Sequence, residues 1–309
     1  MAGARSRWLE LAERQMSMGQ PAQAIESLRR ALSEDPDDAD AHALLALCLY
    51  DMRRPHAAAH EAALALALEP ESTLALYAMA HADYSARRLQ QAEEHLARLL
   101  ALAPRQPAAL RLLAAVRTLR GRSAEAGALL EEALAEDAED PQTLADLGRW
   151  HLARGRLDEA ERRAREALAL QPEHGEALVL MGHVLLRRGR VEEAREHALW
   201  ALGNDARDDG ALGLMAAVKA RRNWFLGLWW RWSTWLGSLG DGRAIVVLLG
   251  VYVLYSFADI AATNNGMHEL ATQMRVAWLA LIAYTWFGPA MFQRALQREL
   301  AAVRLRKEF

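Results

Sequence analysis

The sequence has few cysteines, prolines and glycines. Cys48 is the single cysteine among 309 residues, so an intramolecular disulfide is excluded. Its neighbours Ala46, Leu47 and Leu49 indicate a small buried side chain rather than a reactive thiol. The 9 prolines and 19 glycines are too few for a fibrous chain, and a hydrophobic content of 52% excludes a disordered one.

An excess of charge of one sign is also missing from the whole chain, which has 37 basic and 40 acidic residues. The two ends differ, because residues 1–223 carry a net charge of −6 and the part from Trp224 onward carries +3. Phosphate binding needs a concentrated basic face, so we expect no nucleic acid partner for the acidic part. The basic part suits an anionic membrane surface.

Sequence motifs of catalysis are absent as well. The chain has no glycine-rich phosphate loop, no nucleophile elbow and no HExxH zinc motif. His56 and His60 stand four residues apart beside Glu61, but such pairs arise often by chance and suit an exposed helix face better than a metal site. We therefore expect no enzyme activity, no cofactor and no bound metal.

The beginning of the chain lacks a targeting signal. Arg5 and Arg7 are not followed by an apolar run, so no cleavable secretory signal is expected. The N-terminal part is accordingly expected to stay in the cytosol.

What the sequence does contain is a repeat. Pro36, Pro70 and Pro104 are 34 residues apart, and Pro172 falls two periods beyond Pro104. With that period, one column holds alanine in six successive units, namely Ala24, Ala58, Ala92, Ala126, Ala160 and Ala194. A second column holds only small residues, namely Ala12, Ala46, Ala80, Ala114, Gly148 and Gly182.

Each unit reads as two helices joined by a short turn. Two apolar stretches with helical spacing flank a polar turn, and small residues in register let the two backbones approach closely. Four of the turns carry the residue that most easily adopts a left-handed conformation, namely Gly19, Gly121, Gly155 and Gly189. The prolines then end the second helix of a unit.

These columns resemble the tetratricopeptide repeat family over residues 5–208, as six units. In the first unit the matching residues are Trp8, Leu11, Ala12, Ala24, Leu28, Ala31 and Pro36. Arg53 and Arg87 stand where the turn glycine is usual, and Ala138 and Ala206 stand where the proline is usual. The resemblance implies an all-α, right-handed solenoid. Residues 209–222 are predicted to form a partial seventh repeat or capping helix.

The family resemblance also implies a concave face that holds a protein or peptide partner and is lined by the first helix of each unit. Carried to this sequence, the face includes Glu13, Leu44 and Leu47 together with the seven residues expected to bind the partner, namely Tyr50, Tyr77, His81, Tyr84, Arg111, Arg149 and His183. The alternative is that some side chains of this face pack between helices, Leu44 and Leu47 above all. Lysine and asparagine, which one subclass uses to grip a C-terminal carboxylate, are replaced here by Leu9, Glu13 and Leu47.

Residues 243–309 are predicted to form a transmembrane hairpin. The run 244–262 has 19 residues and one charge, Asp259, and a helix of that length nearly matches the hydrocarbon thickness of a bilayer. The run 276–292 has 17 residues without charge and lies between Arg275 and Arg294. Basic residues lie outside the connecting loop, so both termini are expected in the cytoplasm.

Segment 223–242 is rich in tryptophan, a residue that concentrates at the depth of lipid headgroups. Its tryptophans are Trp224, Trp229, Trp230, Trp232 and Trp235. We predict an interfacial helix on the cytoplasmic leaflet, or alternatively a cap on the open end of the solenoid.

In such a hairpin Asp259 and Arg275 lie at similar depth, near the outer interface. An ion pair would reduce the cost of placing either charge near hydrocarbon. The alternative is that each side chain reaches headgroup water independently.

The main functional hypothesis is a non-enzymatic, membrane-anchored scaffold whose repeats recruit a protein or peptide partner. The chain has only two lysines, Lys219 and Lys307, and much alanine, which points to a GC-rich bacterial genome and hence to the inner membrane. The alternative is a regulatory or structural subunit of a membrane transport or envelope-assembly complex, in which the hairpin itself is functional.

Overall fold

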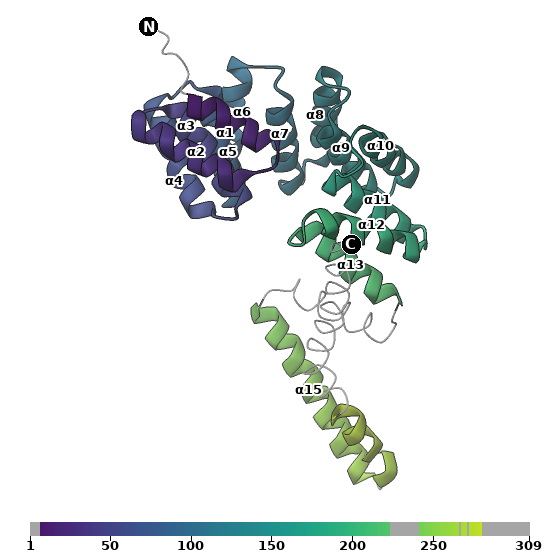
Figure 1. Ribbon diagram of the computed structural model, residues 1–309. Coiled ribbons are helices and arrows are strands. Elements are labelled where there is room, and N and C mark those ends of the chain that lie inside the picture. Colours follow the sequence, from purple (N-terminus) through teal and green to yellow (C-terminus); the bar gives the residue numbers. More distant parts are fainter. Residues whose placement is uncertain (1–6, 223–240, 266, 271, 280–309) are drawn as a thin grey trace. The chain divides into compact units, whose positions relative to one another are not determined.

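The computed structural model describes residues 7–222, 241–265, 267–270 and 272–279, and all regular structure in these ranges is helical (Figure 1). The chain divides into two compact units, Met1–Arg154 and Gly155–Phe309, and the boundary falls in the turn of the fifth repeat. Each unit is described by itself.

The first unit is a run of helices in which each packs against the next (Figure 1). Its helices are α1 (Arg7–Ser17), α2 (Pro21–Glu34), α3 (Ala39–Asp51), α4 (Pro55–Leu68), α5 (Thr73–Ser85), α6 (Leu89–Leu102), α7 (Pro107–Leu119), α8 (Ser123–Glu136) and α9 (Pro141–Ala153). The odd-numbered helices are the first helices of the repeats. They also contact one another, as in α3 with α5 and α5 with α7.

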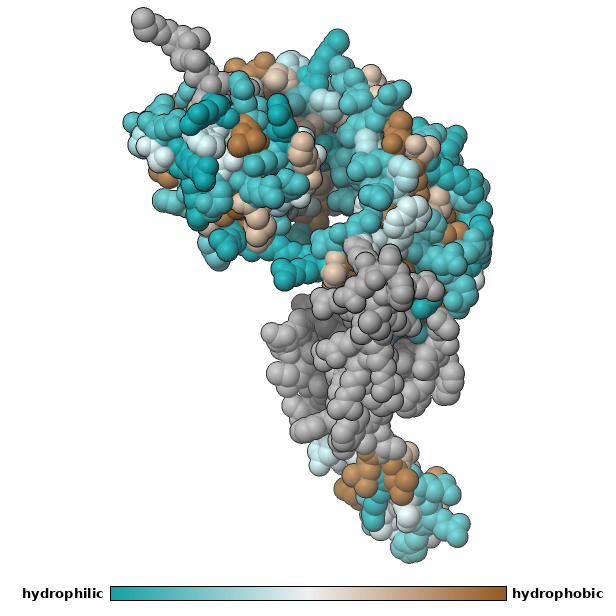
Figure 2. Space-filling model, viewed as in Figure 1, coloured by the Kyte–Doolittle hydropathy of each residue, from teal (hydrophilic) through white to brown (hydrophobic). Residues whose placement is uncertain are grey.

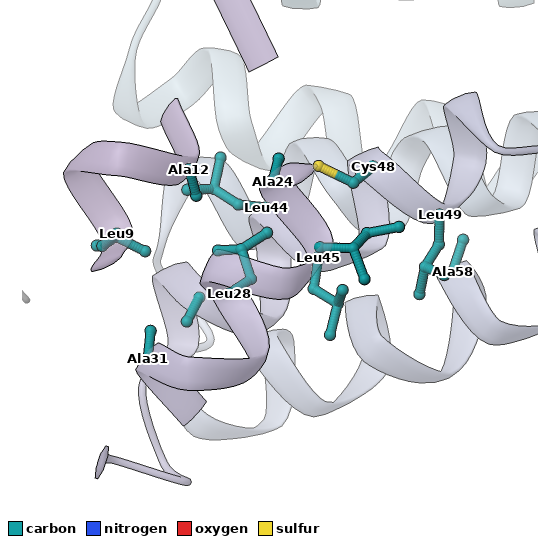
Figure 3. Close-up of a cluster of buried hydrophobic side chains, with 12 residues drawn as sticks. Leu9, Ala12, Ala24, Leu28, Ala31, Leu44, Leu45, Cys48, Leu49 and Ala58 are labelled. Atoms are coloured by element: carbon teal, nitrogen blue, oxygen red, sulfur yellow. The ribbon is translucent and has the colours of Figure 1, made fainter. Parts of the chain in front are cut away.

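The small-residue columns lie at the contacts between helices, as the repeat predicts. All six alanines of the column that begins with Ala24 are 3% exposed or less. Figure 3 shows how Ala12 and Ala24 lie among Leu9, Leu28 and Leu44 in the core of the first repeats. Because no larger side chain stands at these places, neighbouring helices pack closely.

The turn between the helices of a repeat keeps the same backbone conformation with or without glycine. Gly19 and Gly121 have φ of +68° and +78°. Arg53 and Arg87, which stand at the glycine place, have φ of 58° and 60°. An arginine in this left-handed region costs free energy, so the packing of the repeat, and not the turn residue, determines the turn.

The second helix of a repeat ends at the same place whether or not proline follows. Helices α2, α4 and α6 end two residues before Pro36, Pro70 and Pro104. Helix α8 ends at Glu136, two residues before Ala138, and thus stops without a proline. The next first helix begins on a capping side chain in several repeats, as when Asp38 accepts a hydrogen bond from Ala41 N at 2.9 Å.

Neighbouring repeats are also joined by a periodic ionic contact. Glu93 on α6 pairs with Arg120 at the end of α7, and Glu161 pairs with Arg188 27 residues further on, with 2.7 Å between Nη2 and Oε2. Gly127 stands at the same place in the repeat between them. There the ring of Trp150 covers Gly127, and the guanidinium of Arg154 lies 4.6 Å from the ring centroid of Trp150. An aromatic ring thus replaces the carboxylate as the partner of the arginine.

The second unit continues the repeat pattern with α10 (Leu157–Leu170), α11 (Gly175–Arg187) and α12 (Val191–Asn204). Helix α13 (Asp209–Arg222) packs against both α11 and α12. Leu214 and Met215 of α13 are fully buried, and Leu214 fills the space that the missing side chain of Gly182 leaves.

Helix α15 (Asp241–Asn264) runs without interruption through the range 244–262 that the sequence predicts to be helical. Residues 272–279 form a helical segment that runs antiparallel to α15: Arg275 contacts Asp259, and Trp278 stacks on Tyr255 with ring centroids 4.5 Å apart. Within the described ranges, no helix is both long and apolar enough to cross a membrane. Most of the expected second span, 280–292, and all five tryptophans of segment 223–242 lie outside the described residues.

Candidate partner-binding site

Six of the seven residues predicted for the partner-binding face belong to the first helices of the first unit. Helix α3 carries Tyr50, α7 carries Arg111 and α9 carries Arg149. Helix α5 carries the other three, Tyr77, His81 and Tyr84, whose spacing of four and three residues puts them on one side of the helix. We call these six residues the first-helix face.

Tyr50, Tyr77 and His81 form an aromatic cluster at one end of this face. The ring of His81 meets Tyr50 edge-on at 4.8 Å between centroids and Tyr77 at 5.0 Å. A hydrogen bond of 3.2 Å joins His81 Nε2 to the hydroxyl of Tyr77. All three side chains are partly buried, so the cluster joins α3 to α5 while one side of it still reaches solvent.

His81 is held in its neutral form. Burial lowers its pKa to about 4, and the nearby positive charge of Arg111 acts in the same direction. Its Nδ1 is buried and has no hydrogen-bond partner among the residues that the structure describes. Burial also raises the pKa of Tyr77, which therefore keeps its hydroxyl proton at neutral pH.

Arg111 joins α7 to α9 through two carboxylates. Its Nε lies 3.5 Å from Asp140 Oδ2, and its Nη1 lies 3.8 Å from Asp146 Oδ2. Asp146 in turn lies 3.4 Å from Nη2 of Arg149, one turn along α9. The two separations at Arg111 are long for hydrogen bonds, so this side chain keeps donor capacity for a further acceptor.

Asp140 is also the N-cap residue of α9. It accepts hydrogen bonds from Gln142 N at 3.1 Å and from Thr143 N and Oγ1 at 3.2 and 2.5 Å. Burial by itself would raise the pKa of Asp140, but these hydrogen bonds and Arg111 outweigh it and lower the pKa below the ordinary value. Asp140 therefore stays charged and fixes where α9 begins.

A pocket of about 290 Å³ opens between α7 and α9. Its lining includes Tyr84, Arg111, Asp146 and Arg149, and the other lining residues are Ala114, Ala115, Thr118, Leu119, Ser123, Leu130, Trp150 and Ala153. We call this the α7–α9 pocket. Three of the residues predicted from the sequence thus meet at one hollow of the surface.

The other predicted residues are distributed differently. His183 lies on α11 in the second unit, which is described separately. Leu44 is buried in the core at 7% exposure and Leu47 is partly buried against a core cluster, so the alternative that these two pack between helices is confirmed.

Several pocket residues were not singled out by the sequence. Asp146, Trp150, Ala115 and Thr118 also line it. Asp146 could have been found from its spacing of three residues to Arg149, which places both on one helix face. The indole of Trp150 is fixed by a hydrogen bond of 2.7 Å from Nε1 to the carbonyl of Ser123, a contact between repeats that carries no local signal.

The described residues contain no group of three or more His, Cys, Asp or Glu side chains that could hold a metal ion. Burial raises the pKa of Cys48 to about 12, so its thiol stays protonated.

The fold and the repeat columns define a tetratricopeptide repeat protein. Two tetratricopeptide repeat models match residues 15–61 and 77–141, and a third model, described as the Cilia and flagella-associated protein 70 middle TPR-like domain, matches residues 110–303. The chain belongs to this last family of TPR-like domains, whose model covers more than half of it. Proteins with such repeats are generally non-enzymatic scaffolds for protein–protein interaction. No curated protein matches the chain in sequence.

Solved structures of other proteins share the tetratricopeptide repeat fold. A thermophilic TPR protein of Thermus thermophilus is 25% identical, with a TM-score of 0.55 over 59% of this chain and 100% of that chain. A tetratricopeptide repeat protein from Parabacteroides merdae is 17% identical, with a TM-score of 0.57 over 69% of this chain and 83% of that chain. PilW, a type IV pilus biogenesis factor, is 19% identical, with a TM-score of 0.52 over 67% of this chain and 96% of that chain.

Proposed function

We propose that the chain recruits a partner protein by binding a segment of it on the first-helix face of the first unit. The observation that carries this proposal is the meeting of Tyr84, Arg111 and Arg149 at the α7–α9 pocket. Apolar walls with a few convergent polar groups are the usual composition of a binding site. His183, on α11 of the second unit, is proposed separately as a further partner-binding residue.

The chemistry of the face suits a peptide backbone and its side chains. Tyrosine and arginine contribute much binding energy at interfaces because they combine large contact area with directed hydrogen bonds. The neutral His81 and the protonated Tyr77 add polar groups without adding charge.

We further propose that the C-terminal part anchors this scaffold in a membrane as a two-span hairpin. The sequence supports it with the nearly uncharged runs 244–262 and 276–292. Large apolar side chains on the described part of the hairpin are exposed, with Leu254 at 72% and Phe257 at 70% on α15 and Leu279 at 65% on the facing segment (Figure 2). Water-soluble surfaces seldom carry such a concentration, so lipid is the proposed cover.

In this proposal the domains are those of the sequence prediction. Repeats occupy 5–208, a capping helix 209–222, an interfacial segment 223–242 and the hairpin 243–309. The five tryptophans of the interfacial segment would contact lipid headgroups, and both termini would lie in the cytoplasm. The bacterial inner membrane is the membrane that the composition favours.

Partner capture tests the binding proposal. The full chain in detergent, its Tyr84→Ala, Arg149→Glu variant and a matched Arg105→Glu variant are compared as baits in lysate of the source cell. Arg105 is 81% exposed, does not line the pocket and pairs with Glu136. We expect the partner to be lost from the first variant and kept by the second, and equal capture by all three would refute the proposal.

Cysteine labelling tests the anchoring proposal. Cys48 is buried and unreactive, so the wild-type chain gives a low background with a membrane-impermeant maleimide. His268→Cys places a thiol between the two runs, and Glu10→Cys places one in the first unit. We expect intact cells to label only the former, whereas labelling of neither site, or of both alike, would contradict a hairpin with both termini inside.

A second candidate function is suggested by Asp259, the one charge of the run 244–262, and its ion pair with Arg275 just before the second run. Charged residues inside membrane segments often serve function, which would make the hairpin a working part of a transport or envelope-assembly complex. Replacing residues 243–309 by an unrelated two-span anchor separates the candidates, because a scaffold alone should keep its activity.

A further inference from the structure

The α7–α9 pocket exists because α7 carries small side chains at two places where the preceding first helices carry large ones. In one column of the repeat the residues are Leu47, His81, Ala115 and Arg149. In another they are Tyr50, Tyr84 and Thr118. The space between α3 and α5 is accordingly filled by the ring contact of Tyr50 with His81, whereas α7 leaves its space to α9 open.

We propose that the α7–α9 pocket is the specificity pocket of the partner site and receives one aromatic side chain that is flanked in the partner by an acidic residue. This inference rests on the proposed function and specifies its ligand.

The size of the pocket favours a single side chain. About 290 Å³ is at the lower end of the ~300–1,000 Å³ that small-molecule sites usually offer. The ring of Trp150 and the ring of Tyr84 both line the pocket, and Ala114, Leu130 and Ala153 complete a largely apolar wall. Aromatic rings pack edge-to-face or offset against one another, so this lining favours an aromatic guest over an aliphatic one.

The charges in the lining favour an acidic neighbour. Of the three charged residues that line the pocket, Arg111 and Arg149 are basic and Asp146 is acidic. The side chain of Arg149 is 54% exposed, and its contact with Asp146 is 3.4 Å long. The exposed guanidinium of Arg149 can therefore donate to a guest carboxylate, and the two arginines against one aspartate in the lining favour an acidic guest over a basic one.

The repeat itself supplies variants that fill the pocket and still fit the fold. Ala115→Leu introduces leucine, which stands at the equivalent place of an earlier repeat as Leu47. Thr118→Tyr introduces tyrosine, which stands at the equivalent places of two earlier repeats as Tyr50 and Tyr84. Ala97→Leu on the exposed face of α6 is the matched control, because it adds the same side chain outside the pocket.

Selection from a phage-displayed library of random dodecapeptides on the full chain in detergent tests the proposal. We expect the selected peptides to share an aromatic residue next to Asp or Glu. Fluorescence anisotropy with one selected peptide should give affinity losses of ~10-fold or more for Ala115→Leu and Thr118→Tyr, and no loss for Ala97→Leu. Arg149→Glu should lower the affinity for the acidic peptide and raise the affinity for the same peptide with lysine in place of the acidic residue.

The outcomes separate this inference from the function on which it rests. Peptides that bind the pocket-filled variants as well as the wild-type chain, but lose affinity with Tyr50→Ala, would overturn the pocket and leave the first-helix face as the binding site. Selected peptides without the aromatic–acidic pair would overturn the inference in the same way. Self-association of the chain that Ala115→Leu abolishes would assign the pocket to a second copy and also overturn it. A library that yields no specific peptide would count against both.

Discussion

Arg275 donates two parallel hydrogen bonds to Asp259, from Nε to Oδ1 at 3.0 Å and from Nη2 to Oδ2 at 3.1 Å. The pair joins α15 to the helical segment that follows it, and Nη2 of Arg275 also lies 3.5 Å from the hydroxyl of Thr263. The sequence leaves two alternatives, this ion pair or two side chains that act independently, and the structure has the ion pair. Two-point contacts of this kind fix orientation as well as charge.

Removing the charges of Asp259 and Arg275 one at a time and together tests whether the two residues are coupled. In the proposed membrane hairpin, Asp259→Asn or Arg275→Gln alone leaves one charge without its partner near hydrocarbon, so each should lower accumulation of the full chain severalfold. The double variant leaves neither charge and should accumulate better than either single variant. Quantitative immunoblotting of membrane fractions measures the amount of each variant. If the loss in the double variant equals the two single losses combined, the two residues are not coupled.

The two left-handed arginines predict a route to greater stability. Arg53→Gly and Arg87→Gly should each raise the free energy of unfolding by about 1 kcal/mol, because glycine adopts positive φ without steric cost. Gly121→Arg is the reverse control: no atom would contact its Cβ, so only the backbone conformation is penalised. Thermal unfolding followed by circular dichroism measures all three, and a lower midpoint for the glycine variants would contradict the account of the turn.

His81 makes stability depend on pH. Its pKa of about 4 in the folded chain lies below the ordinary 6.5, so the unfolded chain binds the extra proton first as the pH falls. The contribution of neutral His81 to the free energy of unfolding is fully present above about pH 6.5. It is lost as the pH falls from about 6.5 to about 4. The free energy of unfolding should therefore be about 2 kcal/mol lower at pH 5 than at pH 7.

The matched variant for this pH effect is His81→Leu, because Leu47 occupies the same column of the preceding repeat. Urea unfolding at pH 7 and pH 5 should give a smaller difference for this variant than for the wild-type chain. Equal differences would show that His81 does not sense the change.

Gly127 and Trp150 predict a pair of compensating changes. A Cβ at Gly127 would overlap the ring of Trp150, so Gly127→Ala should cost about 1–3 kcal/mol. Gly127→Glu combined with Trp150→Val installs the acid–arginine arrangement of Glu93 and Arg120 and should recover much of that loss. Chemical unfolding of the three proteins tests it, and a double variant less stable than Gly127→Ala would refute the equivalence of the two arrangements.

The repeat and its helices were predictable because they depend on composition at a fixed period. Ala24 and Ala126 must be small wherever two helices cross closely, and that requirement is visible in the sequence without any structure. The turns at Arg53 and Arg87 were less predictable, since the local residue disfavours the conformation that the surrounding packing imposes.

The site was predictable only in part. The 34-residue register places Tyr84, Arg111 and Arg149 on first helices, and the structure brings these three to one pocket. The pocket itself arises because the side chains of Ala115 and Thr118 are small. Small side chains in a sequence do not indicate an open space until the positions of the surrounding residues are known. The indole of Trp150, anchored to the carbonyl of Ser123 27 residues away, is a long-range contact of the same kind.

The central claim is that a partner protein binds the first-helix face of the first unit, and site-specific photocrosslinking in living source cells tests it most directly. A photoreactive residue is placed at Leu119 or Ala153, which are exposed and line the α7–α9 pocket beside Tyr84 and Arg149, or at Ala97 or Glu132, which are exposed and lie outside the pocket. The account predicts one crosslinked protein from the first two positions and none from the other two. Crosslinks of equal yield from all four positions, or only from Ala97 and Glu132, would contradict it.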